Sequence, residues 1–216
     1  EIAYLIFNLT ASDSDKNDII KEMLGLISDK KVFNKRSNLE EIDFGFKNTD
    51  AIENFVNQYG DNKYELIILS KSEFEESING LSMKDNIIEP YFDNNVCKMG
   101  RIINSTTDSV SIVYLEQEIY ASDQTLNEIY SKVYDIINNN EKISDIKTTI
   151  KETNIKPRVV TLEKMDQLVP GLGMNRQIVR WAFNEETNSN EPKFFDLEDK
   201  YIITILSNIS ENETQL

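Results

Sequence analysis

Histidine is absent from the 216 residues, so no part of the sequence can use an imidazole as a general base or as a metal ligand. The one cysteine, Cys97, excludes an intrachain disulfide and a zinc site made of several cysteines. No stretch approaches the roughly 18 to 20 consecutive apolar residues of a membrane-spanning helix. The sequence therefore implies no metal, no cofactor and no transmembrane segment within its length.

Basic side chains are few relative to acidic ones. The sequence has 23 Lys and Arg against 38 Asp and Glu, which gives a net charge of −15. Such a field repels the phosphates of nucleic acids and anionic lipid surfaces, so a nucleic-acid partner is not expected. The hydrophobic content of 39% and the charged content of 28% are typical of a soluble globular protein rather than a disordered one.

The two halves of the sequence repeat one pattern. Each half has a Tyr-Leu pair, then an Ala-Ser-Asp triplet, then a helical run of apolar residues. These features begin at Tyr4 and at Tyr114, which is 110 residues later (114 minus 4). We therefore predict two tandem modules, 1–105 and 106–210, joined by the polar segment 104–108 and followed by an acidic tail at 211–216.

Within each module the hydrophobic pattern predicts strands and helices in a similar order. The expected strands are 2–9, 64–69, 96–103, 110–119, 159–162 and 200–206. The expected helices are 13–27, 51–59, 72–78, 81–88, 123–137, 143–153 and 175–183; 30–47 is expected to be a loop or short irregular helix, and 89–90 and 191–192 turns. Ser12 or Asp13 is expected to cap the first helix. The predicted fold class is α+β, each module being a small mixed sheet packed by helices.

One apolar stripe is a candidate binding surface. Met174, Ile178, Trp181 and Phe183 follow a Gly-Leu-Gly turn at helical spacing. Methionine and aromatic side chains suit promiscuous apolar binding, but the same spacing is typical of the core stripe of an amphipathic helix. Trp181 and Phe183 are two residues apart and cannot both face one way. Phe74 is the corresponding candidate in the first half.

The order of elements, and the stretch from Pro170 to Asn184, resemble the parvulin-type prolyl isomerases. That family runs strand, helices, strand, helix, turn, strand. The stretch, which includes Met174, Ile178 and Trp181-Ala182-Phe183, is similar to the C-terminal part of the large SurA/PpiD-type periplasmic folding factors of Bacteroidota. Larger relatives of this type place a histidine-bearing domain between two such modules, whereas here the two copies join directly.

The sequence departs from the parvulins where catalysis is concerned. The resemblance implies one histidine in the first strand of each module, near Leu5 and near Leu115. A second would fall in the last strand, near Lys98 in the first copy and near Tyr201 or Ile202 in the second. All five positions carry other residues. The modules are therefore expected to be degenerate and to lack catalytic residues.

The resemblance implies a non-catalytic chaperone or scaffold part of a periplasmic folding factor. Its partners would be unfolded or nascent exported proteins and the secretion or outer-membrane assembly machinery. The parent protein would be anchored to the inner membrane through a segment outside this sequence. Two alternatives stay open: a prolyl isomerase that works without histidine, and a purely architectural interaction module. The segment Asp108-Ser109-Val110 also matches the O-glycosylation pattern of Bacteroidota, with Ser109 as acceptor.

Overall fold

The computed structural model describes residues 1–36, 38–139, 156–189 and 191–210. The expected helix at 143–153 and the expected tail at 211–216 lie outside these residues. The described chain is α+β, as predicted, and forms two compact units. Unit 1 consists of Glu1–Thr10 and Ser122–Leu216, and unit 2 consists of Ala11–Ala121. Every described strand pairing is antiparallel, whereas mixed sheets were expected.

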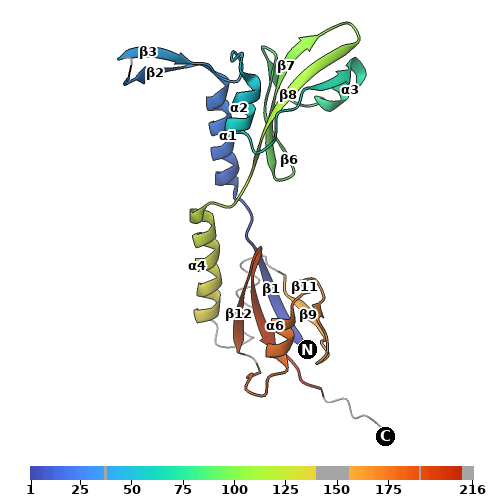
Figure 1. Cartoon of the computed structure of the whole chain (residues 1–216). Helices are drawn as coiled ribbons and strands as arrows, with labels where there is room; N and C mark the ends of the chain where they lie inside the picture. Colours follow the sequence, from blue (N-terminus) through green and yellow to red (C-terminus); the bar gives the residue numbers. More distant parts are fainter. Residues whose placement is uncertain (37, 140–155, 190, 211–216) are drawn as a thin grey trace. The chain divides into compact units, whose positions relative to one another are not determined.

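Unit 2 is built around a five-stranded sheet in the order β4-β8-β7-β6-β5 (Figure 1). Its elements are α1 (Asp13–Ile27), β2 (Lys30–Asn34), β3 (Leu39–Asp43), α2 (Ile52–Tyr59), β4 (Ile67–Ser70), α3 (Lys71–Ser77), β5 (Met83–Lys84), β6 (Ile87–Asp93), β7 (Val96–Ser105) and β8 (Ser109–Glu118). Met23 and Leu26 of α1 share one core cluster with Leu115, while Phe74 of α3 shares another with Ile112. Because side chains alternate along β8, α1 and α3 cover opposite faces of the sheet.

Unit 1 is built around a four-stranded sheet in the order β12-β13-β1-β9. Its elements are β1 (Ile2–Asn8), α4 (Asp123–Asn139), β9 (Arg158–Val160), β10 (Leu168–Val169), β11 (Gly173–Met174), α6 (Arg176–Ala182), β12 (Pro192–Leu197) and β13 (Lys200–Leu206). Leu5 packs in a cluster with Val133 and Ile136 of α4. Tyr4, on the opposite face of β1, packs in a cluster with Ile178 of α6.

Local sequence signals set the helix starts. Ser12 caps α1 through a capping box, as its Oγ accepts from the Asp15 amide at 3.2 Å and its own amide donates to Asp15 Oδ2 at 2.8 Å. Ser70 and Glu73 form the same box at the start of α3. Each box satisfies amide protons that the first helical turn leaves unpaired. Of the two caps predicted for the first helix, Ser12 and Asp13, the structure shows Ser12 as the cap.

The two units share one arrangement of elements but exchange their central strands. Apart from β2, β3, α2 and β5 in unit 2 and β10 and β11 in unit 1, the order helix, short strand, helix, hairpin occurs as α1-β4-α3-β6-β7 and again as α4-β9-α6-β12-β13. In unit 1 the hairpin is extended by β1 and then β9; in unit 2 it is extended by β8 and then β4. Strand β1 therefore lies in the sheet built from the second half of the chain, and β8 in the sheet built from the first.

The division into units differs from the expected tandem modules 1–105 and 106–210. Periodicity locates each strand and the helix that follows it, yet it does not say which sheet the strand joins. That choice depends on cross-strand pairing. Here β1 pairs with β13 over seven residues, from Ile2 opposite Leu206 to Asn8 opposite Lys200, and with β9 on its other side.

Three local predictions were wrong. Residues 30–47, expected to be a loop or irregular helix, contain the β2–β3 hairpin. Residues 81–88, expected to be a helix, contain β5 and the start of β6, because the buried neighbours Ile87 and Ile88 belong to different core clusters, as adjacent residues of a strand do. Glu89-Pro90 lies inside β6 rather than in a turn, at a register shift between Ile88 and Tyr91 that accommodates the missing amide proton of proline.

The pairing of β1 with strands from the second half of the chain predicts which unit each strand stabilises. Leu5→Ala should lower the stability of unit 1 by about 2–5 kcal/mol, since it removes a buried side chain from its core. Trp181, the only tryptophan, reports on unit 1, and Cys97, the only cysteine, reports on unit 2. In a urea titration, Leu5→Ala should shift the Trp181 fluorescence transition to lower urea and leave Cys97 labelling protected.

Leu115→Ala is the matched control, because Leu115 occupies the corresponding position in β8. It should expose Cys97 to a thiol reagent at lower urea and leave the Trp181 transition in place. If Leu5→Ala instead exposes Cys97 without moving the Trp181 transition, β1 belongs to the sheet of the first half. The assignment of β1 to unit 1 would then be wrong.

Candidate functional site

The structure does not bring the predicted binding residues together into one groove. Phe74 is buried in unit 2, while the other four residues lie in unit 1. Ile178 is fully buried in the core of unit 1. Trp181 is half-buried and meets Phe195 edge to face, with 5.7 Å between ring centroids. Only Met174, which is 78% exposed, and Phe183 present much of their side chains to solvent.

A cleft of about 580 Å³ surrounds Met174 but is lined mainly by polar and charged groups. One wall is the start of α6, where Arg176 donates to the carbonyl oxygen of Lys164 at 2.9 Å. The other wall is the β12–β13 turn with its acidic residues. Asn175 is buried there, and its Oδ1 has no hydrogen-bond partner among the described residues. The cleft therefore suits water or a polar group better than an apolar peptide.

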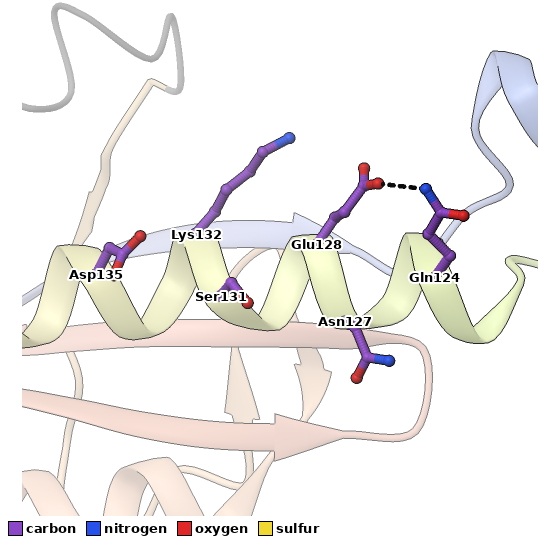
Figure 2. Close-up of a pocket in the computed structure, with 6 residues that line it drawn as sticks. All are labelled: Gln124, Asn127, Glu128, Ser131, Lys132 and Asp135. Carbon is purple, nitrogen blue, oxygen red and sulfur yellow. Dashed lines mark hydrogen bonds between the residues drawn. The ribbon is translucent and has the colours of Figure 1, made fainter.

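A second hollow runs along α4 (Figure 2). Its lining residues are polar or charged, although much of the surface that they present there is apolar. All six labelled side chains belong to that helix: Gln124, Asn127, Glu128, Ser131, Lys132 and Asp135. Gln124 Nε2 donates to Glu128 Oε1 at 3.0 Å, as the dashed line shows. Among the described residues, no large apolar side chain lines the hollow on α4, and polar and charged groups dominate the lining of the Met174 cleft, so neither is an apolar groove for an unfolded chain.

Four exposed large apolar side chains of unit 2 lie on the hairpin formed by β2 and β3, here called the arm (residues 30–43). In the cross-strand register Lys31 faces Ile42 and Phe33 faces Glu40, so Phe33 and Ile42 share one face. They are 59% and 57% exposed. Val32 and Leu39 lie on the opposite face and are also exposed. Both faces of the arm therefore present apolar side chains to solvent.

The base of the arm is fixed by a set of contacts within unit 2. The Gly45 amide donates to Asp29 Oδ1 at 3.0 Å, and Asn48 Nδ2 donates to Asp29 Oδ2 at 2.9 Å. Phe46 is fully buried in the core, and its carbonyl oxygen accepts from Arg101 Nη1 at 2.9 Å. The arm thus emerges from an ordered root, so its apolar side chains are presented in a defined direction.

The arm itself has little to stabilise it beyond its own pairing and its root. It forms a two-stranded sheet, and an isolated pair of strands is only marginally stable in water. The Lys31–Glu40 ion pair spans 3.9 Å between exposed side chains, and such pairs contribute little. Near the turn, Asn34 Nδ2 donates to Glu41 Oε1 at 2.8 Å. A partner that covers the arm would therefore add stability to it.

The positions where the parvulin resemblance implies histidines carry buried apolar or ion-paired side chains. Leu5 and Leu115 are buried apolar side chains. Lys98 pairs with Asp93 at 3.0 Å and Glu116 at 3.4 Å, and the hydrogen bond to Asp93 raises the pKa of its ammonium group. Burial raises the pKa of the Cys97 thiol to about 11, so little thiolate is present at neutral pH. Among the described residues no acidic or cysteine cluster could hold a metal ion.

The sequence analysis missed the arm, although a signal for it was present. Lys-Lys-Val-Phe-Asn and Leu-Glu-Glu-Ile-Asp each place apolar residues within a charged strand, and four polar residues (35–38) separate them in the sequence. Opposite charges on the two strands favour cross-strand pairing. The pattern does not predict a strand because its apolar residues do not alternate with polar ones: Val32 and Phe33 are adjacent, and two glutamates separate Leu39 from Ile42.

The root of the arm predicts opposite effects for two Gly→Ala substitutions. A Cβ at Gly45 would lie 2.5 Å from the Ile27 carbonyl oxygen, so Gly45→Ala should destabilise unit 2 by about 1–3 kcal/mol. A Cβ at Gly25, inside α1, meets nothing within 4 Å, so Gly25→Ala should stabilise it by about 0.5–1 kcal/mol. Urea denaturation followed by circular dichroism measures both; equal effects of the two substitutions would contradict a tightly packed root.

Comparison with known proteins assigns no family. No protein-family model matches the chain, and no curated protein matches it. No helix of the described residues has the length and apolar character needed to cross a membrane. The function is therefore argued from the geometry of the arm and from the residues that occupy the core.

Proposed function

We propose that this chain is a non-catalytic, client-binding part of a folding factor, and that the arm is the surface that contacts unfolded clients. The observation that carries the proposal is the exposure of Phe33 and Ile42, on one face, and of Val32 and Leu39, on the other, above an ordered root. Monomeric proteins rarely leave such apolar groups together in solvent unless they bind something.

The parvulin resemblance supports a folding-factor role. Unit 1 contains the strand β1, the helix α4, the strand β9, the helix α6 and the hairpin β12–β13, which is similar to the family order of strand, helices, strand, helix, turn, strand once β1 is counted before α4. We propose that both units are degenerate parvulin-like modules whose first strands are exchanged. A periplasmic location and clients among exported or outer-membrane proteins follow from the same resemblance and are part of the proposal.

The charge of the arm suits contact with varied clients. Residues 30–36 include Lys30, Lys31, Lys35 and Arg36 and no acidic residue. The rest of the chain then has 19 basic and 38 acidic side chains, a net charge of −19. The acidic body keeps the protein soluble, while the basic strand lowers repulsion toward acidic client segments. Clients would be held briefly by apolar contacts and released without chemical change.

Removing the apolar face of the arm should abolish client binding without unfolding the protein. Phe33→Ser with Ile42→Ser removes two exposed side chains, so the stability should change by no more than about 0.5 kcal/mol per site. Light scattering of an aggregating, chemically denatured client measures the effect. The parent chain should suppress aggregation, and the double variant should suppress it several-fold less at equal concentration.

The matched control is Val159→Ser with Met165→Ser, which removes two comparably exposed apolar side chains from unit 1. This variant should retain full suppression of aggregation. Equal loss in both double variants would mean that general surface hydrophobicity, not the arm, is responsible. If the parent chain does not suppress aggregation, the client-binding proposal is wrong. The alternative of a purely architectural interaction module is then favoured.

A proline-peptide assay separates the proposal from catalysis. The barrier to peptide-bond rotation is about 18–20 kcal/mol, and the buried Leu5 and Leu115 offer no group that could act on it. The chain should leave the isomerisation rate of a proline tetrapeptide unchanged. A measurable acceleration that is lost in Met174→Ala would show that the cleft of unit 1 is an active site.

A further inference from the structure

We infer that β1 can leave the sheet of its own chain and complete the same sheet in a second copy, which produces a strand-exchanged dimer. The inference rests on the connectivity of β1 rather than on the proposed client binding. Figure 1 shows β1 in the unit that contains α4 and α6, although the chain continues from β1 directly into α1 of the other unit.

The strand that would be exchanged is a complete structural element. Strand β1 pairs with β13 on one side and with β9 on the other. Ile2 and Tyr4 are buried on one face, and Leu5 and Phe7 on the other. A β1 strand from a second copy would make the same pairings and bury the same side chains. The exchange therefore preserves every described contact of the strand within unit 1.

The connections on either side of the exchanged strands are short. Only Leu9, Thr10 and Ala11 separate the end of β1 from Ser12, the cap of α1. Residues 119–122 separate β8 from α4. Short connections favour exchange between copies, because a short connection restricts how β1 can reach the sheet of its own chain. Pairing with the sheet of a second copy then costs little additional free energy. The cost is then mainly the entropy of association, which higher protein concentration offsets.

The second copy would also complete the Met174 cleft. The Tyr4 hydroxyl donates to the carbonyl oxygen of Pro170, at the turn that leads to Leu172 in the cleft wall. A Cβ on Gly171 would lie 2.8 Å from that hydroxyl, so the turn is fitted closely to Tyr4. In the dimer, Tyr4 of one copy would hold the cleft-lining turn of the other.

Two single-cysteine chains test the exchange, each also carrying Cys97→Ala. Asn8 and Lys200 are opposite partners, and the adjacent Leu9 amide donates to the Asp199 carbonyl at 2.9 Å. Leu9 and Asp199 therefore form a hydrogen-bonded pair. Because hydrogen-bonded and non-hydrogen-bonded pairs alternate along an antiparallel ladder, the pair 8/200 is of the closer, non-hydrogen-bonded type, which suits a disulfide. Chains with Asn8→Cys and chains with Lys200→Cys are refolded together, oxidised and analysed without reductant.

Strand exchange predicts a disulfide between residues 8 and 200 of different copies, giving a species of twice the 25.0 kDa chain mass. Its yield should rise with protein concentration, and mass spectrometry of the linked peptide identifies it. The control mixes Asp196→Cys chains with Tyr201→Cys chains, whose positions pair across β12 and β13 within one hairpin. That mixture should give no 196–201 crosslink above the level of random oxidation.

Two further measurements decide the matter if oxidation is inefficient. Light scattering after gel filtration of the unmodified chain should show a dimer fraction that grows when refolding is done at higher concentration. A flexible Gly-Ser insertion after Thr10 should reduce the dimer fraction several-fold. A longer connection relieves the constraint that favours exchange, so β1 stays in the sheet of its own chain. A monomer at every concentration, or an 8–200 yield no higher than the control, would overturn the inference.

Discussion

The structure depends on the insertion of β1 between β13 and β9. Four of its seven side chains are more than nine-tenths buried: Ile2, Tyr4, Leu5 and Phe7. Burying a large apolar side chain contributes about 1.5–3 kcal/mol, so the four together contribute roughly 6–12 kcal/mol. That is as large as the total stability of a typical domain, about 5–15 kcal/mol. Without this strand, β13 and β9 would not be joined in one sheet, and the core clusters on both faces of that sheet would lose side chains.

Both units depend on a strand of this kind. Each unit takes its central strand from a segment whose neighbouring helix belongs to the other unit. A break within Leu9–Ala11 would separate β1 from α1 without removing a single pairing of the sheet. What the covalent connection supplies is a high effective concentration of β1 near its site. A second copy of the chain competes with that effective concentration, which is why association by exchange depends on protein concentration.

The sequence indicated much of the local structure but little of the pairing. The Ser12 capping box, the helix through Met23 and the strand containing Leu5 follow from short-range patterns. The partner of β1 does not, because Tyr4-Leu5 and Tyr114-Leu115 are similar enough that each could complete either sheet. The arm was missed for a related reason: a strand exposed on both faces lacks the alternation that burial of one face imposes. Of the predicted site residues, Ile178 and Phe74 follow the helical spacing of a core stripe.

The exchanged strands also bear on why imidazole chemistry would be hard to place in this chain. Leu5 faces Val133 and Ile136 of α4, and Leu115 lies in one cluster with Met23 and Leu26 of α1. A histidine at either position would be enclosed by aliphatic side chains, and its ring nitrogens would lose water without gaining a partner, at a cost of about 1–3 kcal/mol or more. The helices that cover these faces therefore favour leucine. Four exposed apolar side chains of unit 2 lie outside its core on the arm, whose base is held by contacts of Asp29, Gly45 and Phe46. Binding at such an arm would not compete with core packing, because its exposed apolar side chains are not the ones that form the core of the unit.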